Sequence, residues 1–273
     1  MKRILSILLL SLVASVRYPS RDEHPTVTIP PASLKQWLNY QESPLNSWYQ
    51  KYVNANGLPV IASATVKDSS LWQVRYIVNT MLYRVPEALD EMLKCHFRIG
   101  VVGHKENITD LPECKMMTEW WPDTDWDARG RGYGATLAIP VMSIGEENVV
   151  KIPNSVDRYK GESIMVHEFA HNVDFALRRI NPAFEAKLLE SYEKARHRGL
   201  WANTYAMTNS EEYWAEGSQA WFNSCNIEVP KIDSTGSSRL KTREQLKVYD
   251  FDLYSLLSTV YPSIELQGYN FDY

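Results

Sequence analysis

The sequence predicts an α+β fold with a small mixed sheet, helices packed on it and a mostly helical C-terminal part. Three short apolar runs bounded by turn residues, at 59–66, 97–102 and 135–141, have the length and composition of strands. The longer segments between and after them repeat apolar residues at the three- and four-residue spacing of amphipathic helices. A few strands among many helices indicate one sheet that buries an apolar face under helices.

The composition is that of an ordinary globular protein, and it excludes one class of partner. Of the 273 residues, 44% are hydrophobic and 23% are charged, which is typical of one or two folded domains. Lys and Arg number 29 against 33 Asp and Glu, which gives a net charge of −4. A chain without excess positive charge has little attraction for a phosphate backbone, so no nucleic-acid partner is expected.

The N-terminus has the layout of a secretory signal peptide, which we assign to residues 1–15. Lys2 and Arg3 precede an apolar run of about ten residues, and small residues that suit cleavage follow it. The run is shorter than the roughly 20 residues that span a bilayer, so we expect a secreted chain with no membrane span after cleavage. An N-terminal membrane anchor, with Arg17 and Arg21 as its stop, is the alternative.

Export changes the interpretation of the three cysteines. In an oxidising compartment, two of Cys95, Cys114 and Cys225 are expected to form a disulfide, which leaves one free thiol. The short loop between Cys95 and Cys114 favours that pair, although pairing with Cys225 and a bond between chains stay open. No two of them have the C-x-x-C spacing of a redox or zinc motif.

The N-terminal half is predicted to contain both helices and strands. A helical segment at 16–57 includes a helix over 33–53 that Pro44 interrupts; whether this segment is a regulatory pro-segment stays open. The main domain, 58–273, begins with the strand at 59–66. It continues with helices after Ser69 or Ser70 and at Pro86, the strand at 97–102, a Trp-rich connection, a turn at 129–134, and an edge strand at 135–141 that contains Pro140.

The C-terminal half is predicted to be helical. Residues 162–177 are apolar on nearly every side, which indicates a buried helix. Asn181 and Pro182 are a typical N-cap and first residue of the next helix. Further helices are predicted at 211–225 and within 240–261.

The predicted buried helix carries a motif for metal chemistry, His167-Glu168-Phe169-Ala170-His171. Two histidines four residues apart lie on one face of a helix, so both imidazoles can bind a single Zn²⁺ at about 2.0–2.1 Å. Glu168 would lie beside the metal, where its carboxylate can take a proton from a zinc-bound water. The alternative is a pair of core histidines with ordinary hydrogen bonds. Because two imidazoles and a carboxylate on an apolar helix are costly to bury, a divalent cation is the simplest partner.

A hydrolytic zinc ion needs a third protein ligand and an open position for water. The extended motif H-E-x-x-H-x-x-G-x-x-H does not supply it, because Asp174 and Leu177 occupy its Gly and third His positions. A carboxylate from another helix is the other known solution. Glu211, Glu212 and Glu216 are the candidates.

The downstream segment Tyr205-x-x-x-Asn209-x-x-Glu212-Tyr213-Trp214-Ala215-Glu216, together with the H-E-x-x-H motif, resembles the catalytic domain of anthrax lethal factor and the related Pro-Pro endopeptidases, a gluzincin-type zinc metallopeptidase family. The resemblance is specific over 162–225 and only general elsewhere. It implies a zincin-like catalytic domain over 58–273. The roles it implies are metal ligands for His167, His171 and Glu212, general base for Glu168, oxyanion-stabilising hydroxyl for Tyr205, and orientation of a liganding histidine for Glu216.

Each implied role has a structural alternative. Tyr205 could be a packing tyrosine, and Glu212 could be the capping-box partner of Asn209. Asp174 lies three residues after His171, where it could hydrogen-bond within the site or face water, and the sequence does not decide between the two.

We therefore expect a secreted zinc endopeptidase that acts on a peptide or protein substrate. Residues 134–139 form an edge that could pair with an extended peptide. The alternatives are a secreted zinc-binding module that cleaves nothing and a zinc hydrolase of another bond. The sequence leaves the substrate and the oligomeric state open.

Overall fold

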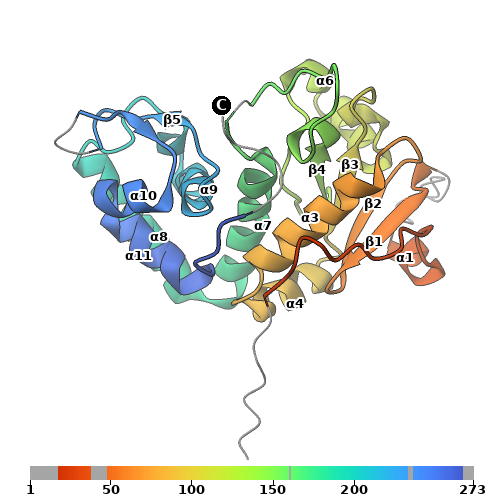
Figure 1. Cartoon of the computed structure of the whole chain (residues 1–273), viewed down its shortest axis with the longest axis horizontal. Coiled ribbons are helices and arrows are strands. Elements are labelled where there is room, and N and C mark those ends of the chain that lie inside the picture. The colour runs from red at the N-terminus through yellow and green to blue at the C-terminus, as the bar shows by residue number, and fades with distance from the viewer. Residues whose placement is uncertain (1–17, 38–47, 160, 233–235, 267–273) are drawn as a thin grey trace, which may run out of the picture.

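The computed structural model describes residues 18–37, 48–159, 161–232 and 236–266 (Figure 1). Its elements in chain order are α1 (Ala32–Trp37), β1 (Lys51–Ala55), β2 (Leu58–Ala62), α3 (Asp68–Met81), α4 (Pro86–Lys94), β3 (Arg98–Val102), η1 (Ile108–Asp110), η2 (Pro112–Cys114), α5 (Lys115–Trp120), α6 (Trp126–Arg129), β4 (Val141–Gly145), η3 (Glu146–Asn148), α7 (Ile164–Ile180), α8 (Pro182–His197), η4 (Tyr205–Met207), α9 (Ser210–Trp221), β5 (Ile227–Glu228), β6 (Arg239–Leu240), α10 (Arg243–Tyr249) and α11 (Phe251–Val260). The signal peptide predicted at 1–15 lies outside the described residues. Over the described ranges, no helix is both long and apolar enough to cross a membrane.

Four strands form one mixed sheet in the order β1-β2-β3-β4, and β5 pairs with β6 separately. β1 is antiparallel to β2, and the other neighbours are parallel, so the expected α+β fold with a small mixed sheet is confirmed. Asn56 and Gly57 join β1 to β2 with positive φ angles of 53° and 109°, as in a two-residue hairpin turn. This turn makes the helix predicted over 33–53 wrong at 51–53, although α1 confirms its first part. The middle of that prediction, 38–47, lies outside the described residues.

Side chains alternate along the strands and so divide the core between the two faces of the sheet. In β2, Val60 and Ala62 belong to the larger cluster with α3, α4 and α7, whereas Ile61 belongs to a smaller cluster with η1, η2 and α5. The three cysteines are free thiols. The predicted Cys95–Cys114 disulfide is therefore wrong. Cys114 is buried in the smaller cluster, and Cys95 packs against the larger one on the other face.

The last parallel strand begins later than the sequence suggested. β4 starts only after Pro140, so the strand predicted at 135–141 is wrong except for its final residue. Thr136 and Ile139 instead form a turn, in which Thr136 N donates to Ile139 O at 2.9 Å and Ile139 N donates to Thr136 Oγ1 at 3.0 Å. Local side-chain and backbone hydrogen bonds of this kind compete with strand pairing.

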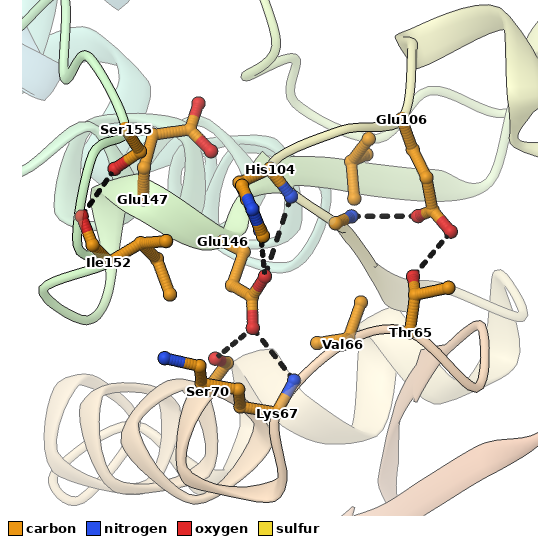
Figure 2. Close-up of polar contacts among 12 residues, drawn as sticks. Thr65, Val66, Lys67, Ser70, His104, Glu106, Glu146, Glu147, Ile152 and Ser155 are labelled. Carbon is orange, nitrogen blue, oxygen red and sulfur yellow. Dashed lines mark hydrogen bonds and ion pairs between the residues drawn. The ribbon is translucent and has the colours of Figure 1, made fainter.

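Two carboxylates connect the loops that follow β2, β3 and β4 (Figure 2). Glu146, fully buried after β4, accepts a hydrogen bond from Lys67 N at 2.7 Å and lies 3.2 Å from His104 Nδ1 in the loop after β3. Glu106, also after β3, accepts a hydrogen bond from Thr65 Oγ1 at 2.6 Å. Because buried Glu146 and partly buried Glu106 accept hydrogen bonds from other loops, these loops are held together at the carboxyl edge of the sheet.

α7 lies between the sheet and the C-terminal helices, and it packs along α9 (Figure 1). It is buried along most of its length, as predicted. Trp214 Nε1 on α9 donates to Ala170 O on α7 at 3.1 Å, within the H-E-x-x-H motif. Asn181, predicted to cap α8, accepts the expected backbone hydrogen bond, and Asn209 accepts the corresponding bond at the start of α9.

Asp250 fixes the other side of α9. Its buried carboxylate accepts hydrogen bonds from Tyr213 Oη on α9 at 2.7 Å and from Trp201 Nε1 at 2.9 Å. It also caps α11 through Leu253 N at 3.2 Å. α9 is therefore positioned from both sides, by α7 and by the start of α11.

We expect Asp250→Ala to lower the free energy of unfolding by about 3 kcal/mol or more. The change removes a helix cap worth about 1 kcal/mol and leaves the buried Trp201 donor without an acceptor, at about 1–3 kcal/mol. The Tyr213 hydroxyl keeps only its longer contact with Ser191 O, at 3.4 Å. Urea unfolding measures the difference. Asp252→Ala is the control, because Asp252 pairs with basic side chains at the surface and should contribute less than about 1 kcal/mol. Equal losses in the two variants would contradict this role of Asp250.

Candidate metal centre

The three side chains predicted as metal ligands meet between α7 and α9. His167 Nε2 lies 3.0 Å and His171 Nε2 lies 3.4 Å from the same oxygen, Oε2 of Glu212. Across the described ranges, this is the only group of three or more acidic, histidine or cysteine side chains whose ligand atoms lie within 4.8 Å of one another. Two ligands of a tetrahedral zinc ion at about 2.0–2.1 Å are about 3.3 Å apart, so this donor set and its spacing fit zinc.

The structure separates the three carboxylates that the sequence left open. The Glu212 carboxylate faces the histidines, and the Asn209 cap uses only its backbone N–H, which donates at 2.8 Å; the capping-box alternative for its side chain is therefore wrong. Glu211 faces an arginine of α7, 3.4 Å away. Glu216, one turn after Glu212, approaches the other ring nitrogen of His167, Nδ1, at 3.8 Å.

Gln219, which the sequence analysis did not single out, orients His167. Its Nε2 donates to Ser163 O at 3.1 Å, so its Oε1 is turned toward His167 Nδ1, 3.3 Å away and closer than the Glu216 carboxylate. An amide oxygen only accepts hydrogen bonds, so Nδ1 carries the proton and Nε2 is free to bind a cation. Gln219 lies seven residues after Glu212. This spacing places both side chains on the same face of α9, so the sequence could have indicated that Gln219 lies near the ligands.

Negative charge surrounds the two histidines. Burial alone would lower the pKa of His167, but the hydrogen bond to Glu212 and the charges of Glu168 and Glu216 raise it to about 9. Burial would raise the pKa of Glu212, yet its hydrogen bonds with both histidines keep it well below the usual range. Burial raises the pKa of Glu216 to about 8. Such an environment attracts protons and divalent cations alike.

Glu168 lines a cleft with a volume of about 610 Å³, which His167, His171 and Glu212 also line. Burial raises the pKa of Glu168, and the two histidines oppose this rise. A carboxylate with a raised pKa beside a cation site has the properties of a general base.

One wall of the cleft is the segment 130–135, here called the glycine segment, which lies directly against α7. A Cβ atom at Gly132 would lie 2.7 Å from a methyl group of α7, and one at Gly134 would lie 3.1 Å from the Cβ of His171. Asn172 Oδ1 on α7 accepts a hydrogen bond from the last N–H of the segment at 2.8 Å. The two glycines thus permit a close approach that larger residues would prevent.

Arg131 connects the glycine segment to the carboxyl edge of the sheet. Its guanidinium donates to three backbone carbonyls in and after β3 and forms an ion pair with Glu147 at 2.7 Å. Tyr133 exchanges two backbone hydrogen bonds with Ser143 of β4, at 3.2 and 3.0 Å. The sheet therefore determines how the glycine segment faces Glu168.

Tyr205 lies in η4 and lines the same cleft. The residue is 58% exposed, and its ring stacks beside the ring of His167 at a centroid distance of 6.3 Å. Partial burial, the charge of Glu212 and a hydrogen bond to it raise the pKa of Tyr205 to about 12. The phenol therefore keeps its proton and can donate a hydrogen bond into the cleft.

Asp174, which the sequence left undecided, is not a member of the ligand group. It is 2% exposed, and both of its carboxylate oxygens accept hydrogen bonds from Arg178 Nε, at 2.8 and 2.9 Å. Its environment is an ion pair within the helix interface.

Comparison with known proteins shows a weak likeness to a solved structure. No protein-family model and no curated protein match the chain. The chain is similar to the Pro-Pro endopeptidase PPEP-2 from Paenibacillus alvei, with 16% sequence identity and a TM-score of 0.46, over 74% of this chain and 97% of that one. A likeness this weak supports no conclusion about function, so the assignment below depends on the geometry of the site.

We expect Gln219→Met to weaken zinc binding by about 10–100-fold, because His167 loses the acceptor that fixes its tautomer and ring orientation. The change keeps the side-chain length, so the packing of α9 should be preserved. Competition titration with a chelator of known affinity measures the dissociation constant. Ser218→Ala is the control, since Ser218 is the buried neighbour that contacts Tyr261 on another side of α9. Unchanged affinity in Gln219→Met would show that Gln219 does not orient the ligand.

Proposed function

We propose that the chain is a secreted, zinc-dependent endopeptidase with a zincin-like catalytic domain. One observation carries the proposal: two histidines on α7 and a carboxylate on α9 converge at an open cleft, with a second carboxylate, Glu168, beside them. His₂Glu is a ligand set used by hydrolytic zinc. The proposal of secretion depends only on the sequence pattern at 1–15.

In this proposal, His167, His171 and Glu212 hold the zinc ion. When bound, zinc polarises a carbonyl oxygen and lowers the pKa of a water molecule. Glu168 takes the proton from that water and later returns it to the leaving amine. The Tyr205 hydroxyl donates a hydrogen bond to the oxyanion that develops on the substrate carbonyl.

The cleft suggests where a substrate lies. The glycine segment and Tyr205 both line the cleft, so we propose that an extended peptide binds along them. The turn between Thr136 and Ile139 removes the second half of the pairing edge expected at 134–139. Backbone pairing is therefore proposed only for the glycine segment.

A zinc-binding module without hydrolytic activity is the main alternative. Such a module would need neither a base beside the metal nor a phenol facing it, and a structural zinc site is normally closed by a fourth protein ligand. The described ligand group has three members and adjoins the 610 Å³ cleft, which favours the enzyme. Hydrolysis of a bond other than a peptide bond uses the same chemistry and is tested by the same variants.

We expect Glu168→Gln to keep one zinc ion per chain and to lose at least about 100-fold in peptide hydrolysis, since it removes the general base and leaves the ligands in place. The measurement is cleavage of a diverse peptide library that includes proline-flanked bonds, followed by mass spectrometry and joined to metal analysis.

Tyr205→Phe should lower kcat and also keep zinc.

Chelator-treated wild type is the control for contaminating proteases. Cleavage by Glu168→Gln at the wild-type rate would remove Glu168 from the mechanism. Cleavage that survives chelation in the purified protein would remove the metal from it.

A further inference from the structure

We infer that the pair of buried Asp174 and partly buried Arg178 positions the third metal ligand. Arg178 holds the first turn of α9 against α7 and thereby directs Glu212 toward His167 and His171. The inference depends on the proposed metal site. It gives a role to Asp174, for which the sequence left open whether it hydrogen-bonds within the site or faces water.

The pair continues the face of α7 that presents the metal site. His171, Asp174 and Arg178 are spaced i, i+3 and i+7, so they lie one above another on one side of the helix. Asp174 is almost completely buried and accepts both short hydrogen bonds from Arg178 Nε. The guanidinium is therefore fixed in orientation before it contacts any other helix.

The remaining donors of Arg178 extend to two other helices. One terminal nitrogen donates to Ser210 Oγ, the first residue of α9, at 3.0 Å and lies 3.4 Å from the carboxylate of Glu211. The other donates to Glu185 on α8 at 3.0 Å. The α9 contacts are made by the two residues immediately before Glu212, so Arg178 contacts the same helical turn that carries this ligand.

Positioning explains this pair better than stability does. The Asp174 carboxylate is buried and the Arg178 side chain is 17% exposed, so the loss of hydration offsets much of their attraction and the pair contributes little net stability. Its donors and acceptors do fix relative orientation, since a planar guanidinium accepts few geometries. The contacts of α9 with Ala170 and Asp250 are made by Trp214 and Tyr213, which follow Glu212, whereas those of Arg178 are made by the residues that precede it.

The test cuts only the contacts to α9. In Ser210→Ala/Glu211→Gln, the buried Asp174–Arg178 hydrogen bonds remain and no ligand changes. Glu185→Gln is the matched control, because it removes one carboxylate charge from the same guanidinium but on α8. Competition titration measures zinc affinity, and thermal unfolding measures stability. Amide hydrogen exchange of residues 211–213 in metal-free protein measures how firmly the first turn of α9 is held.

We expect the double variant to bind zinc at least about 10-fold more weakly, with faster exchange at the start of α9 and a small change in melting temperature. Glu185→Gln should match wild type in affinity and exchange. Should the double variant unfold, Ser210→Ala alone is used, with the same expected direction.

Wild-type zinc affinity in the double variant, with or without faster exchange, would overturn the inference, as would an equal loss in Glu185→Gln. If the wild-type protein binds no zinc, the proposed function fails, and exchange still decides whether Arg178 holds this turn. Unchanged exchange in that case would overturn the inference as well.

Discussion

The site depends on one contact, in which the carboxylate of Glu212 lies between the imidazoles of His167 and His171. None of these groups is easily buried alone, and their meeting point is the interface of two largely buried helices. The packing of α9 on α7 therefore decides whether a carboxylate is available to the histidines. Trp214, Asp250 and Gln219 each fix a different part of that packing.

The sheet acts on the site indirectly, through the glycine segment. Arg131 binds the backbone after β3 and the carboxylate of Glu147 after β4, so the carboxyl edge of the sheet sets the position of a wall of the cleft. Glycines at 132 and 134 then allow that wall to touch α7 beside Glu168. The glycine segment, held by the sheet, forms one wall of the cleft, and α7 with α9 forms another.

The sequence predicted features that are encoded locally. Helical spacing places His167 and His171 on one face, and the asparagine caps at 181 and 209 define where α8 and α9 begin. Wrong predictions involved contacts between distant segments or unrecognised turns: the Asn56-Gly57 hairpin replaced a helix end, and opposite faces of the sheet separated two cysteines expected to pair. Gln219 was missed because its partner, His167, is distant in sequence.

We propose that two nitrogen ligands and one carboxylate bind a zinc ion that keeps an open position. The decisive measurement is X-ray absorption spectroscopy at the zinc edge on protein purified with its metal. Mass spectrometry gives the zinc content of the same sample. We expect one zinc ion per chain with two imidazole nitrogens, one carboxylate and one exchangeable water oxygen. A sulfur ligand, a third imidazole, or protein without stoichiometric zinc after incubation with the metal would contradict it.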